Sequence, residues 1–366
     1  MKWSFRLGAL AGIGVYIHAT FFLLIAWVGY SHYARERSWT DALEGVGFIC
    51  ALFACVVAHE FGHALTARRF GIRTRDITLL PIGGLARLER MPEDPKQELL
   101  VALMGPAVNV VIATAVFGWL ALTGSPWSLA ALDIAGGDFL ARLGVVNIFL
   151  VVFNMLPAFP MDGGRVLRAL LALRLDYNRA TQIAASVGQA MALLFGLLGL
   201  FSNPILLFIA LFVWMGAEQE ASMTQMKTAL SGLPVSIAMV REFHTLHADD
   251  ALQRAVDLVL QSSQHDYPVV RDGALVGVLT RQDLFAALAG GGLTQRVEEV
   301  MLTDIQTADP GDMLDAAFRR LQECKCRVMP VVRGGAVLGL LTMDNVGELM
   351  SVQSALGRRQ GRIALG

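Results

Sequence analysis

The stretch Val57-Ala58-His59-Glu60-Phe61-Gly62-His63-Ala64 decides the fold, and it lies inside an apolar segment at about residues 43–66. On a helix, side chains four positions apart project from one face, so His59 and His63 can present imidazole nitrogens to a single tetrahedral metal ion. Glu60 then lies beside that ion, where it can take a proton from bound water. The sequence therefore predicts a helix at membrane depth that carries two metal ligands and a base.

The pattern H-E-x-x-H also arises by accident in unrelated sequences, which makes a purely structural role for the three side chains the alternative. Its location weighs against that alternative. Ionisable residues inside a membrane helix cost at least about 2.5–3.5 kcal/mol each on insertion scales, so they need partners there. A metal ion would be such a partner.

Composition indicates a membrane protein with a soluble part attached. Hydrophobic residues make up 55% of the 366 residues, charged residues only 17%, and the mean hydropathy is +0.53. Soluble proteins average about 25% charged residues. The formal net charge of −1 and the sequence pI near 6.7 offer no basic surface of the kind that nucleic acid requires. Nucleic acid is therefore excluded as a partner.

Four apolar stretches are close to the length of about 20 residues that a helix needs to cross a bilayer, and two further apolar stretches follow them. They lie at about residues 10–30, 43–66, 98–122, 139–157, 181–201 and 203–217. We interpret the first as a retained helix rather than a cleaved signal peptide, because its apolar run is too long for one. We therefore expect a polytopic α-helical membrane protein with about six transmembrane helices.

Lysine and arginine predict the orientation, because short cytoplasmic loops carry an excess of them. The segments after the second and fourth stretches are rich in arginine, from Arg68 to Arg90 and from Arg165 to Arg179, whereas the loop at 123–138 has no basic residue. The arginine-rich segments should be cytoplasmic. Both chain termini should then face the cytoplasm, and we expect a multi-pass protein of a bacterial cell membrane.

Beyond about residue 218 the chain becomes charged and alternating, which is typical of a soluble domain. The tail repeats itself without gaps at an offset of 62 residues, so that Tyr267–Thr280 matches Met329–Thr342. Each copy reads as helix, strand, turn, strand, helix, with Asp272-Gly273 and Gly334-Gly335 as the hairpin turns. We expect a membrane domain at 1–217, a linker at 218–234, an α/β repeat pair at 235–352 with copies at 235–290 and 297–352, and a tail at 353–366.

A catalytic zinc site usually has three protein ligands and one open position, so a third ligand is needed. The segment from Asn154 to Arg165 contains Pro157, Pro160 and the pair Gly163-Gly164, which should interrupt a helix at membrane depth. Asp162 lies in this segment and would supply an oxygen ligand. From the residues alone, a turn or helix-cap role for Asp162 is equally compatible with the sequence.

These two motifs, in this order and on these spans, resemble the site-2 protease family of intramembrane zinc metalloproteases. The resemblance covers about Gly12 to Arg165. It includes three further pieces of sequence, Gly12-Ile-Gly-Val-Tyr-Ile-His18, Pro81-Ile-Gly-Gly-Leu-Ala-Arg87 and Gly105-Pro-Ala-Val-Asn109. Each piece alone is a weak signal, but their combination is highly specific.

The resemblance implies a role for each residue. His59, His63 and Asp162 would bind zinc (Zn2+), Glu60 would be the catalytic general base, and Asn154 and Asn109 would hold the substrate or its developing oxyanion. For the two asparagines, hydrogen bonding between helices is the alternative. The implied activity is that of an endopeptidase that cuts a transmembrane segment of another protein within the lipid bilayer, for signalling or maturation.

The repeated pair resembles tandem CBS (cystathionine-β-synthase-type) modules over about residues 235–350. Some modules of this kind bind ATP or another adenine nucleotide, and the resemblance implies that Thr280 and Asp283 would contact its phosphate or ribose. The second copy departs from that pattern, because Asn345 occupies the acidic position. A folded pair that binds no nucleotide and mediates homo-oligomer assembly is the alternative.

Two other functions could use the same residues. A transporter could use the histidine pair and Asp162 as a zinc or proton pathway, with the repeat pair as its gate. A catalytically inactive scaffold could retain substrates without cutting them. Glu60 favours the protease over the transporter, because a transport site needs no base at that offset, and the intact ligand set argues against the scaffold.

Overall fold

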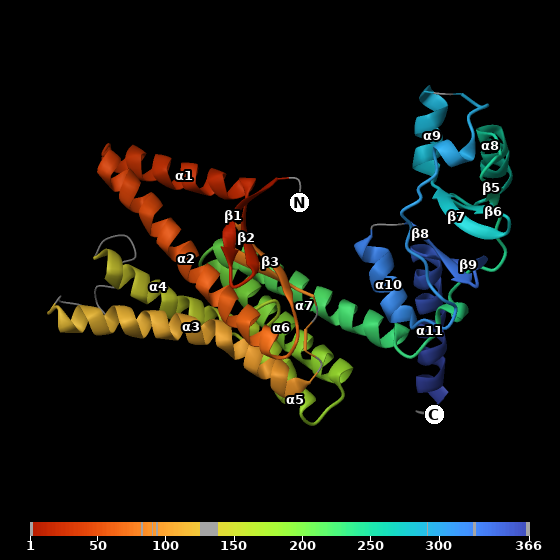
Figure 1. Ribbon diagram of the computed structural model, residues 1–366. Coiled ribbons are helices and arrows are strands. Elements are labelled where there is room, and N and C mark those ends of the chain that lie inside the picture. The colour runs from red at the N-terminus through yellow and green to blue at the C-terminus, as the bar shows by residue number, and fades with distance from the viewer. Residues whose placement is uncertain are drawn as a thin grey trace. The chain divides into compact units, whose positions relative to one another are not determined.

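The computed structural model describes residues 3–81, 83–89, 91–92, 94–124, 138–290, 292–324 and 327–363. It divides into two compact units, Met1–Thr224 and Gln225–Gly366. The first contains helices α1 to α6, most of α7 and a four-stranded sheet, and the second contains the remaining helices and strands (Figure 1).

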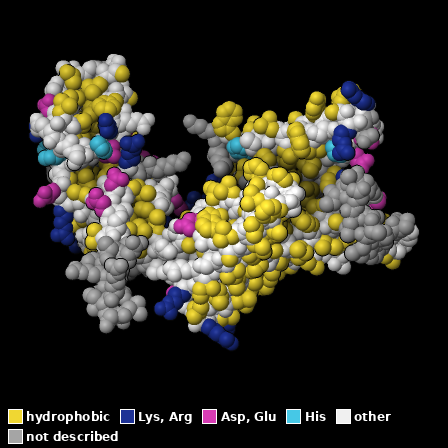
Figure 2. Space-filling view, turned by 180° about the vertical axis from the view of Figure 1, so that it is seen from behind, with side chains coloured by type: hydrophobic (Ala, Val, Ile, Leu, Met, Phe, Trp, Pro, Cys, Tyr) yellow, Lys and Arg dark blue, Asp and Glu magenta, His cyan; other side chains and the backbone are white. Residues whose placement is uncertain are grey.

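The first unit is built from apolar helices. Four of the helices in the described residues are long and apolar enough to cross a bilayer: α2 (Trp39–Arg69), α3 (Pro95–Leu122), α6 (Tyr177–Phe201) and α7 (Ile205–Leu230). Shorter helices are α1 (Ala19–Glu36), α4 (Phe139–Asn154) and α5 (Asp162–Ala172). Hydrophobic side chains cover a broad continuous area of this unit (Figure 2). The predicted class, a polytopic α-helical membrane protein, is confirmed.

The first of the predicted helices begins later than expected. Within the predicted stretch at about 10–30, Leu10 ends the strand β1 (Ser4–Leu10), the strand β2 covers Ile13–His18, and α1 begins only at Ala19. The strands form a hairpin around Ala11 and Gly12, whose φ angles of 52° and 82° are both left-handed. Two such residues in succession suit a two-residue hairpin turn. An apolar run does not reveal whether it is helix or strand, which is why the start was misplaced.

The strands form a sheet in the order β1-β2-β3-β4, with β3 at Thr74–Leu80 and β4 at Gly83–Leu88. β2 and β3 are parallel, and α1 and α2 connect them, whereas β3 and β4 form an antiparallel hairpin. Ile13 and Ile77 from the sheet pack with Phe61 and Ala64 of α2. The sheet therefore lies against the part of α2 that carries the H-E-x-x-H pattern, and β4 is at its edge.

Four helices of this unit begin at a serine or aspartate whose side chain accepts hydrogen bonds from the free N–H groups of the first turn. Ser38 caps α2, Asp138 caps α4 and Asp176 caps α6. Asp94 caps α3 through the N–H groups of Lys96 and Gln97, and Pro95 follows it at the first helical position. These are the residue types that favour helix starts, so the sequence sets the boundaries locally.

The chain between α4 and α5 is irregular, as its prolines predict. α4 ends at Asn154, residues 155–161 are non-helical, and α5 begins at Asp162. Ala158 and Phe159 of this segment are fully buried, with exposed fractions of 0%. They pack in clusters with residues of α6 and α7. The interrupted backbone is thus enclosed by helices, which is the condition under which irregular chain is tolerated at membrane depth.

The second unit holds two copies of one pattern. The first copy consists of α8 (Leu252–Gln261), β6 (Tyr267–Arg271), β7 (Ala274–Leu279) and α9 (Arg281–Gly290). The second consists of α10 (Leu314–Glu323), β8 (Val328–Arg333), β9 (Ala336–Thr342) and α11 (Met343–Ile363). The short strand β5 (Leu246–His247) pairs with β6. The hairpin turns fall at Asp272-Gly273 and Gly334-Gly335, all with positive φ, as predicted.

The two copies exchange a chain segment. Val240 precedes the first copy's strands, yet it exchanges two backbone hydrogen bonds with Leu340 in β9 of the second copy. Leu302 precedes the second copy's strands and makes the same pair of bonds with Val278 in β7 of the first. The backbone segment before each copy's strands therefore pairs with a strand of the other copy, so the two copies form one module.

Candidate metal centre

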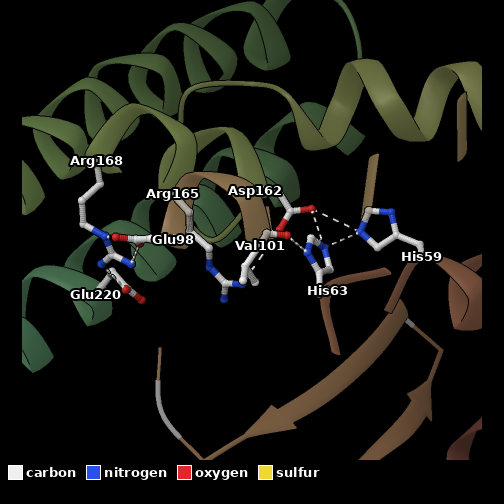
Figure 3. Close-up of polar contacts among 8 residues, drawn as sticks. All are labelled: His59, His63, Glu98, Val101, Asp162, Arg165, Arg168 and Glu220. Carbon is white, nitrogen blue, oxygen red and sulfur yellow. Dashed lines mark hydrogen bonds and ion pairs between the residues drawn. The ribbon is translucent and has the colours of Figure 1, made fainter. Parts of the chain in front are cut away.

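Three ligand-type side chains converge from α2 and α5. The Nε2 atoms of His59 and His63 are 3.0 Å apart, and Oδ2 of Asp162 lies 3.2 and 3.1 Å from them (Figure 3). All three side chains are buried, and among the described residues they form the group of His, Cys, Asp and Glu that could hold a metal ion. Ligands bonded tetrahedrally at about 2.0–2.2 Å lie about 3.3 Å from one another. The observed spacing fits a zinc ion.

The other nitrogen of each ring fixes which nitrogen faces the centre. Nδ1 of His63 lies 2.7 Å from the carbonyl oxygen of Val101, which can only accept, so Nδ1 carries the proton (Figure 3). Nδ1 of His59 lies 2.6 Å from Oδ1 of Asn109 and donates to it in the same way. Both Nε2 atoms then present lone pairs toward Asp162. This is the tautomer that metal-binding histidines need.

A glycine lets α3 approach the two rings. A Cβ atom at Gly105 would overlap the imidazole ring of His63 and lie 2.7 Å from Nε2 of His59. No side chain larger than hydrogen fits there, because carbon atoms that are not bonded stay at least about 3.5 Å apart. The close approach also brings Val101 and Asn109, on the same helix, to the two rings.

Glu60 lies on the side of α2 that faces the sheet. A Cβ atom at Gly84 of β4 would lie 2.8 Å from Cγ of Glu60 and 3.2 Å from Oε1. The edge strand of the sheet therefore passes directly beside the carboxylate. The predicted base thus follows His59 directly on α2 and lies against β4.

The two predicted asparagines occupy different environments. Asn109 has an exposed fraction of 0% and contacts His59. Asn154 is half-buried at the end of α4, and its Nδ2 donates to the carbonyl oxygen of Leu150. It lies directly before the irregular segment that leads to Asp162. The structure therefore brings Asn109 to His59 and leaves Asn154 at the end of α4, bonded to its own helix.

A buried ion cluster, defined as Arg168, Glu98 and Glu220, lies further along α5 (Figure 3). The guanidinium of Arg168 is 2.5 Å from Glu98 of α3 and also pairs with Glu220 of α7. It stacks over the rings of Phe159 and Tyr177 at 5.0 Å. From the sequence, Arg168 was considered only as one of the basic residues of a predicted cytoplasmic loop. A glutamate within an apolar stretch was the signal that a partner had to exist.

Comparison with known proteins identifies the family. The sequence profile of peptidase family M50 matches residues 47–130 and 128–195, and that of the CBS domain matches residues 230–290 and 297–350. A zinc metalloprotease of Methanocaldococcus jannaschii is 32% identical over 357 residues, which cover 96% of this chain and 97% of that protein. The chain belongs to peptidase family M50, the site-2 family of membrane zinc metalloproteases.

One further relative and one solved structure are similar to this site-2 protease. A Mycobacterium tuberculosis protein, also named as a zinc metalloprotease, is 31% identical over 377 residues, covering 96% of this chain and 94% of that protein. Among solved structures, the site-2 protease of Methanocaldococcus jannaschii is 37% identical, with a TM-score of 0.44, over 60% of this chain and 95% of that chain.

The CBS pair of this site-2 protease has a cavity of about 600 Å³. Its lining includes Thr342 and Asn345, the second copy's counterparts of Thr280 and Asp283, and neither Thr280 nor Asp283 lines it. The Thr280 hydroxyl instead donates to Oδ2 of Asp283 at 2.5 Å and accepts the backbone N–H of Asp283, so Thr280 caps the start of α9. The second copy, in which Asn345 replaces the expected acidic residue, thus contributes this pair of residues to the cavity lining.

Proposed function

We propose that His59, His63 and Asp162 bind one zinc ion and that Glu60 is the general base for hydrolysis of a peptide bond. The observation that carries the proposal is the convergence of the three ligand atoms at 3.0–3.2 Å, with both histidine Nδ1 atoms held by acceptors. The substrate is a transmembrane or membrane-associated segment of another protein. Its cleavage serves signalling or maturation.

When bound, zinc lowers the pKa of a water molecule to about 7 and polarises the scissile carbonyl. With zinc held by His59, His63 and Asp162, Glu60 would accept a proton from the water that attacks the carbonyl carbon and would pass it to the amine that leaves. Asn154, at the end of α4, holds the substrate beside the interrupted helix. The hydroxyl group of the water thereby goes to a new carboxylic acid and its other hydrogen to a new amine.

The edge strand β4 supports a way for the substrate to reach Glu60. A substrate helix must unwind before its peptide bond is accessible, and an extended chain can pair with a free strand edge. β4 is the edge of the sheet next to Glu60 and has Leu85 and Arg87 turned outward. A peptide paired with β4 would lie against the catalytic carboxylate.

The experiment that tests this function replaces Glu60 by Gln in the full-length protein. Glu60→Gln should retain about one zinc per chain and lose cleavage of a model transmembrane substrate, because the base alone is removed. Glu44→Gln is the matched control: its carboxylate is half-exposed and pairs with Arg142, outside the site. Normal cleavage by Glu60→Gln would sink the mechanism, and absence of zinc from the wild type would sink the metal assignment.

For the membrane arrangement, we propose a multi-pass protein of a bacterial cell membrane with both termini in the cytoplasm. The functional division we propose is a protease domain at 1–217, a linker at 218–234, a CBS pair at 235–352 and a tail at 353–366. The basic loops support this orientation. Cysteine accessibility labelling of positions in the loops at 123–138 and 173–176 tests it, because the two loops should react from opposite sides.

We further propose that the CBS pair binds an adenine nucleotide, modulates proteolysis and supports homo-oligomer assembly. Thr280 and Asp283 are one candidate site. The cavity at Thr342 and Asn345 is the other, and its lining carries the carboxylates of Glu242, Asp266, Asp344 and Glu348 against the guanidinium of Arg327. So many carboxylates disfavour a triphosphate and favour a nucleoside with little negative charge.

Calorimetry on the full-length protein with ATP and with adenosine separates these cases. Asp283→Ala should weaken binding if the first site is used, and Thr342→Val should weaken it if the cavity is used. Unchanged affinity in Asp283→Ala would remove the assignment to Thr280 and Asp283. If neither ATP nor adenosine gave a heat of binding, assembly would be the remaining proposed role of the CBS pair.

A further inference from the structure

Asn147 of α4 and Asn109 of α3 form a line of hydrogen bonds that ends at His59, which we call the amide relay. Nδ2 of Asn147 donates to the carbonyl oxygen of Leu143 at 2.8 Å. Nδ2 of Asn109 donates to Oδ1 of Asn147 at 2.8 Å, and Oδ1 of Asn109 lies 2.6 Å from Nδ1 of His59. The relay therefore joins three helices.

The direction of every bond in the amide relay follows from its first acceptor. A backbone carbonyl can only accept, so Asn147 must turn its Nδ2 toward Leu143 and its Oδ1 toward Asn109. Asn109 must then offer Nδ2 to Asn147, which leaves Oδ1 for the ring of His59. Nδ1 of His59 consequently carries the proton and Nε2 keeps its lone pair. The backbone of α4 thus determines the tautomer of a residue on α2.

Burial makes a direct contact of either amide with substrate implausible on physical grounds. Asn109 and Asn147 both have exposed fractions of 0%. Side chains this far from any surface act on what they touch, and the described contacts of Asn109 are His59 and Asn147. Amides in apolar helices are costly unless every polar group has a partner, which the relay provides.

The two histidines differ in how firmly their orientation is held. His63 donates to the carbonyl of Val101, a group of the helix backbone that cannot rotate. His59 donates to a side-chain amide, and an amide that turns by half a rotation would offer a donor in place of an acceptor. Among the hydrogen bonds of the described residues, the one from Asn109 to Asn147 opposes that rotation, because it keeps Nδ2 turned away from His59. The orientation of His59 therefore needs a second residue, and that of His63 does not.

We propose that Asn147 is a positioning residue for the metal centre, which acts through Asn109 to hold His59 with Nε2 toward His63 and Asp162. This inference rests on the zinc ligands proposed above. It assigns Asn109 to the orientation of His59 rather than to contact with the substrate. Partners that orient a metal-binding histidine typically change metal affinity by about 10–100-fold when they are removed.

The test measures zinc affinity of the full-length protein in detergent by competition with a chromophoric chelator. Asn147→Leu should weaken zinc binding by about 10-fold, and Asn109→Leu by about 10–100-fold. Asn147→Asp should restore near-normal affinity, because a buried carboxylic acid stays neutral and can donate to Leu143 while it accepts from Asn109. The absorption spectrum of the cobalt-substituted protein should change in Asn147→Leu and not in Asn147→Asp.

Thr181→Val is the matched control. Thr181 has an exposed fraction of 0% and donates to the carbonyl of Tyr177, so this variant also deletes a buried polar group, but far along the chain from the ligands. Its zinc affinity should equal that of the wild type. If Asn147→Leu does not fold, the Asn109→Leu variant tests the same relay one bond closer to His59.

The outcomes separate the relay from the proposed function. A wild-type protein that binds no zinc would overturn the zinc site itself. A wild type that binds zinc tightly, together with Asn147→Leu and Asn109→Leu variants of equal affinity and unchanged cobalt spectrum, would overturn the relay alone and leave Asn147 as an ordinary bond between helices.

Discussion

The guanidinium of Arg168 lies 2.5 Å from the carboxylate of Glu98, and the two side chains are 1% and 0% exposed. Arg168 is on α5, the helix that begins with Asp162, and Glu98 is on α3, which carries the Val101 carbonyl that holds His63. The ion pair therefore connects the helix that carries Asp162, the proposed oxygen ligand, with the helix that orients His63, a proposed nitrogen ligand.

Removal of Arg168 should destabilise the membrane unit strongly. Arg168→Met leaves Glu98 as an unpaired charge in a buried position, which typically costs about 3–5 kcal/mol. We expect a clear fall in the thermal unfolding midpoint of the detergent-solubilised protein. Arg179→Met is the control, because Arg179 pairs with Asp176 at the surface and both side chains are exposed. Equal midpoints for the two variants would show that the buried pair contributes nothing.

Gly105→Ala should abolish zinc binding, whereas another glycine of the same helix should tolerate the change to alanine. The added methyl group would overlap the ring of His63, so α3 must move away and take Val101 and Asn109 with it. Gly118 is on the same helix, and nothing lies within 4 Å of the position that an added methyl group would take, so Gly118→Ala should keep full zinc content. Metal analysis of the purified variants measures this. A Gly105→Ala protein with full zinc content would contradict the close approach.

The sequence predicts those parts of the site that depend on local spacing. His59 and His63 are one helical turn apart, so their common face follows from the helix period alone. Asp162 could be proposed because prolines and glycines interrupt an apolar span around it. The contact that Asn147 makes could not be predicted, because it depends on a partner 38 residues earlier in the chain and on the packing of α3 against α4. Long-range contacts of this kind leave no periodic signal.

Two features of the fold were missed for a similar reason. Hydropathy cannot distinguish the strands at Ser4–His18 from the start of a helix, and Ala11 is an uncommon residue at a left-handed turn position. In the tail, the repeat predicted two matching copies and their turns, which are confirmed. It could not predict that Val240 pairs with the second copy, because both copies have equivalent strands.

Gly339→Val should disrupt the CBS pair without affecting the metal centre. A Cβ atom at Gly339 would lie 2.8 Å from the carbonyl oxygen of Val240, so the exchanged segment could not stay paired with β9. We expect faster proteolysis within residues 225–350 and unchanged zinc content. Gly347→Ala is the control, since nothing lies within 4 Å of its added carbon on α11. Equal resistance of both variants to protease would argue against the exchange.

Asp162→Asn should separate the ligand role of Asp162 from its place at the start of α5. Asparagine keeps the size of the side chain and suits the first turn of a helix, but it removes the negative charge that zinc attracts. We expect the variant to fold, to lose most of its zinc and to lose proteolysis. Asp176→Asn makes the same change at the cap of α6, where the side chain accepts the N–H of Arg179 and pairs with the guanidinium of that residue at the surface. That control should bind zinc like the wild type. If Asp162→Asn also kept its zinc, the two histidines would need another third ligand, and the helix-cap interpretation of Asp162 would be favoured.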